Sequence, residues 1–314
     1  MRFPFFIYDL FEFITGSFSN NKVPVFIIGA PRSGSTLLYQ SMASYFDFGY
    51  FNNFHHKKYF SPSLSEMNKR TLKHNYNSNF KSSYGNVDGE YSPSENWDFW
   101  YRFFRKNPQY VQINEINKWD LRRFKSAINS FLYVTKKHLL IKNLPCVTRI
   151  QPIINAFPRA YWIVIHRNIL DNALSIAKMR IELNKDINEW YSVQPKGYEE
   201  FCDSNYQEQI FKQIELINKT IISDLSLNKN HVSLIKYEEF CNTPKIILDK
   251  LNHKFDELGI NIFKNKNELP LNFNTISNVK SNNDYSKKII DYYNSNRTCI
   301  DSSYNDMINK FGDD

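Results

Sequence analysis

The sequence predicts a three-layer α/β fold, in which helices cover both faces of a parallel sheet. Two observations support this prediction. Short runs of β-branched and aromatic residues recur along the chain, and segments with helical spacing of their apolar residues follow them. Strands that alternate with helices pair in parallel through right-handed crossovers. We therefore expect one domain over residues 25–314, preceded by an amphipathic segment over residues 1–24.

The first predicted strand, residues 25–28, leads into a glycine-rich turn and a helix that begins at Ser35. The turn has the form G-x-x-x-x-G-x-[ST], from Gly29 through Gly34 to Thr36. In such a turn the backbone N–H groups and the helix N-terminus point at one anion. The alternative is a turn that binds nothing, since such turns recur in parallel α/β proteins. The predicted phosphate or sulfate cradle consists of Arg32, Ser33, Gly34, Ser35, Thr36 and Leu37.

The cation of this turn differs from that of a nucleotide-binding loop. A site for ATP or GTP needs a lysine directly before the hydroxyl residue, and Ser35 occupies that position. The cation here is Arg32, inside the turn. The run from Pro31 to Leu37, Pro-Arg-Ser-Gly-Ser-Thr-Leu, resembles the 5′-phosphosulfate-binding loop of sulfotransferases that use 3′-phosphoadenosine-5′-phosphosulfate (PAPS).

The other elements are predicted in order from their apolar patterns. Residues 57–93 and 190–201 are polar or rich in turn residues, and we expect substrate or lid loops there, with disorder as the alternative for the first. The predicted strands are 46–51, 138–142, 157–165 and 231–235. The predicted helices are 94–104, 120–136, 148–156, 168–183, 206–225, 244–258 and 287–293.

The N-terminal segment 3–14 is aromatic and apolar but contains Asp9 and Glu12, and it lacks the cleavage site of a signal peptide. We expect it to be retained as a helix that covers the core of its own domain. An interfacial membrane helix and a partner surface, such as a homodimer interface, are the open alternatives.

Composition limits the class of protein. Hydrophobic residues make up 42% of the chain and aromatic residues 16%, which is typical of a globular protein. No apolar run approaches the roughly 20 residues that span a bilayer. The net charge of +8 suits nucleic acid, an acidic surface or an anionic cofactor equally well, because a positive field attracts any anion. Since no familiar DNA- or RNA-binding motif is present, we expect no nucleic-acid partner.

The cysteines are widely spaced and include no C-x-x-C pair, which argues against a zinc site and a disulfide scaffold. A reducing compartment suits such a set, so we expect a cytoplasmic protein. The residues are Cys146, Cys202, Cys241 and Cys299.

A second anion-binding element follows the strand at 161–165, which ends in His166 and Arg167. A magnesium nucleotide site normally has an aspartate at such a strand end. Ser175 lies eight residues after Arg167 on the following helix, so both side chains can converge on one anion. The alternative is a surface ion pair between Arg167 and Asp171.

This spacing of arginine and serine resembles the 3′-phosphate-binding element of sulfotransferases. Residues 140–145, 156–160 and 235–240 also resemble that family, so the resemblance covers roughly residues 25–258. It implies a P-loop-like parallel sheet, PAPS as donor, no metal, and an adenine that lies near Tyr237.

The general base departs from the family pattern. In cytosolic sulfotransferases a Lys-Thr-His run supplies it, but here Asn143 and Leu144 follow Lys142. Relatives with a similar loop use a carboxylate near the end of the second strand, which this chain lacks. The candidates are therefore Glu95, or else His55 or His56. Each also has a plain structural explanation: Glu95 as a first-turn acid stabilised by the helix dipole, and the histidines as surface residues.

We therefore expect a sulfotransferase that moves a sulfuryl group from PAPS to a hydroxyl or amine and releases adenosine 3′,5′-bisphosphate. Arg32 and Lys142 would neutralise the developing charge. The alternatives are a P-loop kinase or NTPase and a non-catalytic sulfotransferase-like binding protein. Residues 57–93, 190–201, Trp97 and Trp100 are expected to line the acceptor pocket, with saccharide, lipid, small metabolite and peptide left open.

Overall fold

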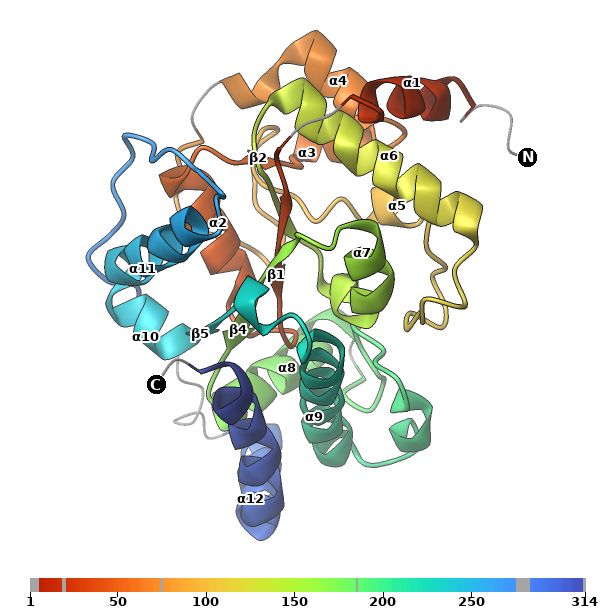
Figure 1. Cartoon of the computed structure of the whole chain (residues 1–314). Helices are drawn as coiled ribbons and strands as arrows, with labels where there is room; N and C mark the ends of the chain where they lie inside the picture. The colour runs from red at the N-terminus through yellow and green to blue at the C-terminus, as the bar shows by residue number, and fades with distance from the viewer. Residues whose placement is uncertain (1–5, 19–20, 74–75, 185, 275–282, 313–314) are drawn as a thin grey trace.

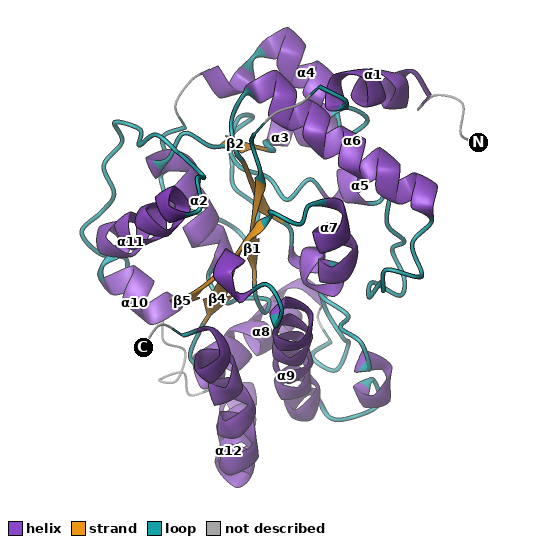
Figure 2. Ribbon diagram, in the orientation of Figure 1, coloured by secondary structure: helices purple, strands orange, loops and turns teal. Residues whose placement is uncertain are grey.

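The computed structural model describes residues 6–18, 21–73, 76–184, 186–274 and 283–312. Its strands form one sheet in the order β2-β3-β1-β4-β5, and each neighbouring pair is parallel. The predicted parallel α/β class is thereby confirmed (Figure 2). The strands are β1 (Pro24–Ile28), β2 (Gly49–Tyr50), β3 (Leu139–Lys142), β4 (Tyr161–His166) and β5 (Val232–Lys236).

Helices cover both faces of the sheet (Figure 1). On one side lie α2 (Ser35–Tyr45), α10 (Tyr237–Asn242) and α11 (Pro244–Glu257), and on the other lie α6 (Lys118–Thr135) and α7 (Ile150–Ala156). A separate group near β5 consists of α8 (Ile169–Asn184), α9 (Tyr206–Leu225) and α12 (Asp284–Phe311). The remaining helices are α1 (Phe6–Gly16), α3 (Asn53–Lys57), α4 (Pro62–Lys69) and α5 (Trp97–Trp100). Single 3₁₀ turns span Thr71–Lys73, Leu144–Thr148, Tyr198–Phe201 and Lys229–His231.

The alternation of side chains along β4 divides the core between the two faces. Trp162 stacks on Phe26 of β1 at a ring-centroid distance of 4.7 Å, whereas its neighbour Tyr161 meets Phe255 of α11 at 5.1 Å. Phe26 in turn contacts Trp100, which packs against Phe124 of α6. The strands are buried on both faces, which explains why their sequences are continuous apolar runs.

Several predicted boundaries are wrong. The strand expected over 46–51 is reduced to β2, because Phe46 and Asp47 bond instead to the segment at 263–264. The loop expected over 57–93 contains α4, whose first turn is capped by the Ser61 hydroxyl. The helix expected over 287–293 extends through all of α12. Helix α10, directly after β5, was not predicted.

The helix expected over 94–104 is also wrong, since only α5 is regular. Its N-cap is Asn96, in the left-handed conformation with φ 48°. Several aromatic side chains of this segment are buried in the core. Trp100 lies between Phe26 of β1 and Phe124 of α6. Glu95 therefore precedes the helix rather than lying in its first turn.

Helix α1 packs against α6 at one end of the molecule, as Figure 1 shows. Within the described residues, no helix combines the length and the apolar character needed to cross a membrane.

Candidate functional site

A cavity of about 900 Å³ lies at the carboxyl ends of β1, β3 and β4. Residues from the β1–α2 turn, the end of β3, the middle of α8 and the start of α10 all line it. Ligands of parallel α/β proteins bind at this end of the strands. The predicted residues that line it are Arg32, Gly34, Ser35, Thr36, Leu37, Glu95, Lys142, Arg167, Ser175 and Tyr237.

The turn after β1 presents open backbone donors to this cavity. The first bond of α2 runs from the Leu38 N–H to the Gly34 carbonyl, so the N–H groups of residues 34–37 precede the helical bonding pattern. The Ser33 N–H instead donates to the Ala30 carbonyl at 3.3 Å, and the Ser33 side chain is buried away from the cavity. Of the predicted cradle residues, Ser33 is therefore the one that does not line the cavity.

Gly34 is required by two features of this turn. Its φ is 95°, in the left-handed region, and a Cβ at this position would collide with the Tyr237 ring. The contact brings the start of α10 against the cradle. Tyr237 was predicted to lie near the adenine, and the structure places its ring beside the turn and in the cavity wall.

Two arginines converge on the same turn. Arg32 Nε donates to Ser175 Oγ at 3.2 Å, and Arg167 Nη1 donates to the Arg32 carbonyl at 3.0 Å. The Arg167 guanidinium lies over the Tyr237 ring, 4.8 Å from its centroid. Among the described side chains, no carboxylate forms an ion pair with Arg32. Burial and the nearby charge of Arg167 lower the pKa of Arg32.

Arg32 therefore brings to this end of the cavity a positive charge with which no carboxylate of the described residues forms an ion pair. A buried cation of this kind favours an anionic ligand, because the ligand supplies the missing counter-charge.

Glu95, the predicted general base, lines the cavity next to the end of β3. Its Oε1 forms a close ion pair with Lys142 Nζ, and its Oε2 accepts a hydrogen bond from the Leu144 N–H at 3.1 Å. Asn143 Nδ2 donates to the Glu95 carbonyl at 3.2 Å. The residues that follow Lys142 thus hold the Glu95 carboxylate beside the end of β3.

The two candidate histidines lie outside this cavity. His55 is fully buried and forms a reciprocal cap with Asn52: its Nδ1 accepts from the Asn52 N–H, while Asn52 Oδ1 accepts from the His55 N–H. Its Nε2 lies 3.2 Å from Glu66 Oε2, so both ring nitrogens are used structurally. His56 follows on α3, and it too is absent from the cavity wall.

Residues that the sequence did not single out complete the site. Asn172 Nδ2 donates to the Pro31 carbonyl at 2.7 Å and holds the turn from the side of α8. The Arg32 guanidinium lies over the Tyr84 ring, 5.4 Å from its centroid. The Gly85 backbone lies beside Glu95 and Lys142. Apart from the approach of Gly85 to Glu95, these contacts join residues more than 40 positions apart in the chain, so no local pattern could indicate them.

The predicted acceptor segments are divided between the site and the core. Residues 80–86, Trp97, Tyr191 and Ser192 line the cavity, whereas Trp100 is buried in the core. In the part of the chain that the structure describes, no cluster of three or more histidine, cysteine or acidic side chains is placed to hold a metal ion.

Comparisons with known proteins agree with the geometry. A family model described as "Sulfotransferase family" matches residues 24–257. The fold is similar to that of sulfotransferase STF9 from Mycobacterium avium, with 10% identity and a TM-score of 0.54 over 94% of this chain and 78% of that one.

Two further solved structures align at lower scores. The sulfotransferase from Alicyclobacillus acidocaldarius has 12% identity and a TM-score of 0.47 over 93% of this chain and 97% of that one. Sulfotransferase STF1 from Mycobacterium tuberculosis H37Rv has 11% identity and a TM-score of 0.47 over 90% and 76%. No curated protein matches the sequence.

Proposed function

The chain belongs to the sulfotransferase family, and we propose that it transfers the sulfuryl group of PAPS to a hydroxyl or amine of an acceptor, with release of adenosine 3′,5′-bisphosphate. One observation carries this proposal: the β1–α2 turn and the Arg167 and Ser175 element, 135 residues apart between Arg32 and Arg167, line a single cavity. A nucleotide with phosphates at both the 5′ and 3′ positions needs two such elements.

The turn would bind the 5′-phosphosulfate. Backbone N–H groups of residues 34–37 would donate to its oxygens, and Arg32 would supply the positive charge. Arg167 and Ser175 would hold the 3′-phosphate, which ATP lacks, and so select the donor. The Tyr237 ring would lie against the adenine, since it borders both the turn and Arg167.

Glu95 would act as the general base. Its carboxylate lines the cavity, is held by the Leu144 N–H and the Lys142 ammonium, and can accept the proton of an acceptor hydroxyl. Lys142 would then face both this carboxylate and the oxygen on which negative charge develops as the sulfuryl group leaves the donor. Positioning and charge neutralisation of this kind supply most of the catalysis in related phosphoryl transfers.

Calorimetric titration with adenosine 3′,5′-bisphosphate in the presence of a chelator tests the proposal. We expect micromolar binding that Ser175→Ala weakens and the matched control Ser226→Ala, on the exposed end of α9, leaves unchanged. Binding that ATP with magnesium matches would contradict the proposal and favour a kinase or NTPase.

A further inference from the structure

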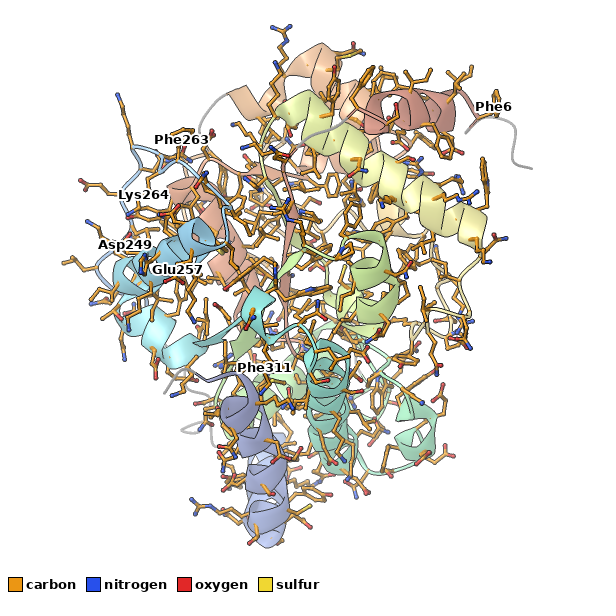
Figure 3. All side chains as sticks on the ribbon, viewed as in Figure 1. Phe6, Asp249, Glu257, Phe263, Lys264 and Phe311 are labelled. Carbon is orange, nitrogen blue, oxygen red and sulfur yellow. The ribbon has the colours of Figure 1, made fainter. Side chains whose placement is uncertain are left out.

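Helix α1 is amphipathic in the inverted sense, with its acidic residues facing the protein. Glu12 is only 1% exposed and Asp9 is half-buried, although both are charged residues on an otherwise apolar helix. The exposed positions of the segment are apolar instead, and Phe6 lies at its outer end, away from the body of the protein (Figure 3). The apolar ridge consists of Phe6, Ile7, Leu10, Ile14 and Phe18, all at least 48% exposed.

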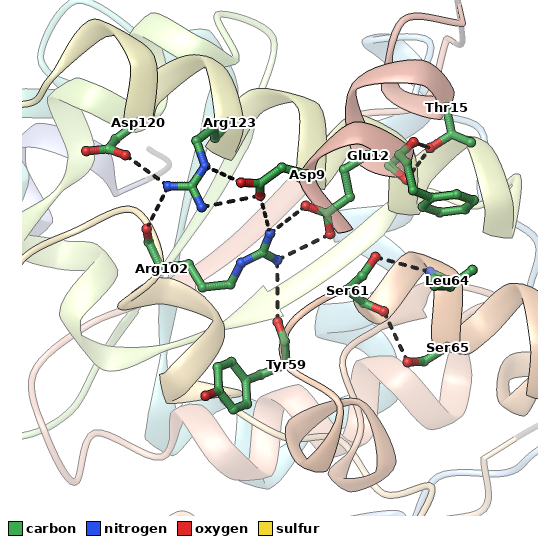
Figure 4. A network of polar contacts seen from close by, with 12 residues as sticks. Asp9, Glu12, Thr15, Tyr59, Ser61, Leu64, Ser65, Arg102, Asp120 and Arg123 are labelled. Atoms are coloured by element: carbon green, nitrogen blue, oxygen red, sulfur yellow. Dashed lines mark hydrogen bonds and ion pairs between the residues drawn. The ribbon is translucent and has the colours of Figure 1, made fainter. Parts of the chain in front are cut away.

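Buried ion pairs fix α1 in this orientation (Figure 4). Arg102 donates from Nη1 to Glu12 Oε1 at 3.2 Å and from Nη2 to Glu12 Oε2 at 2.7 Å, a two-point contact. Arg102 Nη2 also reaches Asp9 Oδ1 at 3.0 Å, and Arg123 Nε reaches Asp9 Oδ2 at 2.9 Å. Rotation of α1 to bury the ridge would expose these acids, leave Arg102 without either of its carboxylates and leave Arg123 with Asp120 alone. The apolar face is therefore held toward the outside.

The surface around the ridge is basic. Among the described residues of segments 6–18, 53–70 and 118–136, every exposed charged side chain is a lysine or arginine, while each acid is buried or half-buried. The exposed basic residues are Lys57, Lys58, Lys69, Arg70, Lys118, Arg122, Lys125 and Lys136.

The basic residues of α6 border the ridge directly. Trp119 and Tyr133 of α6 contact Phe13 and Phe18, at ring-centroid distances of 5.2 Å and 4.8 Å, and Ser130 bonds to Thr15. These α6 positions repeat at helical spacing and face the α1 segment. Lys118, Arg122 and Lys125 occupy the adjacent stripe of the same helix, also at helical spacing, and are exposed.

A small pocket lies on the other side of α1. Its volume is about 270 Å³, and its wall includes Tyr8, Phe54, Phe60 and Leu64 together with Lys58 and Lys69. Tyr8 stacks on Phe60 at 5.8 Å, so α1 itself forms part of this wall. An apolar interior with lysines nearby suits a molecule that has both an apolar chain and an anionic group.

We propose that the ridge and its basic surroundings form a docking surface for anionic membranes. An apolar helix face enters the boundary between lipid headgroups and acyl chains, and nearby lysines and arginines bind anionic headgroups. Charge complementarity selects this occupant: a second copy of the chain would bring the same basic surface against itself, and the two copies would repel. This inference is independent of the proposed reaction, since none of these residues lines the donor cavity.

Sedimentation with vesicles tests the proposal on the full chain. Vesicles of phosphatidylcholine with phosphatidylserine should bind the protein, and vesicles of phosphatidylcholine alone should bind it much more weakly. The variant Ile7→Ser with Leu10→Ser should lose at least roughly tenfold in affinity, because each side chain gives up apolar burial in the bilayer. The variant Lys118→Gln, Arg122→Gln and Lys125→Gln should lose on the order of a hundredfold, at roughly fivefold for each charge.

Matched controls carry the same kinds of substitution at exposed positions away from the ridge. Leu227→Ser with Ile246→Ser, and Lys245→Gln with Lys250→Gln and Lys287→Gln, should bind vesicles as the wild type does. Titration with adenosine 3′,5′-bisphosphate should be the same for all variants, which shows that they are folded.

Failure of the wild type to sediment with phosphatidylserine vesicles would overturn the proposal. A second outcome would also overturn it: the wild type is a dimer and binds no vesicles, and the Ile7→Ser and Leu10→Ser variant is a monomer. The ridge would then be an interface with a second copy of the chain.

Discussion

Two pairs of arginines, one beneath α1 and one beside the cavity, differ in the contacts that hold them. Arg102 and Arg123 are held by three carboxylates, one of them with contacts to both. Arg32 instead donates to a serine hydroxyl, and Arg167 to the Arg32 carbonyl. Within the described chain, the first pair is matched by acids and Arg32 is not.

The pKa shifts reflect this difference. Burial alone would lower the pKa of Arg123, but hydrogen bonds and attraction from Asp9 and Asp120 raise it. Burial and the charge of Arg167 lower the pKa of Arg32. A matched pair joins two elements of the fold, whereas an unmatched arginine in a cavity is suited to a ligand that brings its own negative charge.

The largest expected effect concerns Glu95, the carboxylate that the cavity does contain. If it removes the acceptor proton, Glu95→Gln should lower turnover about 10² to 10⁴-fold, as is typical of a general base. Donor binding should persist, because the amide still occupies the same space. The release of adenosine 3′,5′-bisphosphate, measured with an acceptor found by screening, checks this.

The exposed carboxylate of Glu115 supplies the control, and Glu115→Gln should leave the rate unchanged. Wild-type turnover in Glu95→Gln would show that its ion pair with Lys142 is structural.

Replacement of Arg102, which pairs with buried acid, should destabilise the fold more than replacement of Arg32, which does not. Arg102→Ala leaves the buried Glu12 carboxylate without its arginine and should lower the free energy of unfolding by about 3 kcal/mol. Arg32→Ala strands no acid, and its effect should stay within about 0.5 kcal/mol. Denaturant unfolding of both variants measures this, and equal losses would erase the distinction between the pairs.

Low pH should reduce the stability of the protein through His166, which lies next to Arg167 at the end of β4. Burial lowers the pKa of His166 to about 4, so the folded protein keeps this imidazole neutral where the unfolded chain protonates it. Stability should therefore fall by about 2 kcal/mol as the pH drops from the ordinary histidine pKa toward the folded value. His166→Asn should reduce this fall, which unfolding curves across that pH range would detect. An unchanged pH profile would assign the fall to other groups.

A smaller effect is expected at Asn172, which bonds to the β1–α2 turn but does not line the cavity. Asn172→Ala removes the hydrogen bond to the Pro31 carbonyl and should weaken donor binding by about 1 kcal/mol, the worth of a typical hydrogen bond. Titration with adenosine 3′,5′-bisphosphate measures it, with Asn188→Ala on an exposed loop as the control. Wild-type affinity would mean that the turn holds its shape without α8.

The sequence predicted those parts of the fold that depend on local pattern. Helix α9 has the bounds expected from its apolar spacing, and the buried strands are visible as apolar runs. The prediction for 94–104 was wrong because the aromatic residues of this segment suit a helix by composition, whereas in the structure the left-handed Asn96 delays the start of the helix and it ends after one turn at Trp100, which packs in the core. Tertiary contacts of this kind override local propensity.

The candidate site shows the same limit. The turn after β1 and the spacing of Arg167 and Ser175 could be read from the sequence, because each is a local arrangement. The hydrogen bond from the Leu144 N–H to Glu95 could not, since it joins residues 49 apart in the chain. The orientation of α1 could not be predicted either, because the ion pairs of Asp9 and Glu12 with Arg102 and Arg123 join residues distant in the chain.

The most direct test of the difference between the arginine pairs is calorimetric titration of adenosine 3′,5′-bisphosphate into wild type, Arg167→Ala and Arg123→Ala. Arg167→Ala should weaken binding by about 2 kcal/mol, or roughly thirtyfold, the range of a charge-assisted hydrogen bond. Arg123→Ala should bind as the wild type does. Equal affinity in Arg167→Ala and the wild type, or no binding by the wild type, would contradict the assignment of this cavity to a sulfotransferase donor.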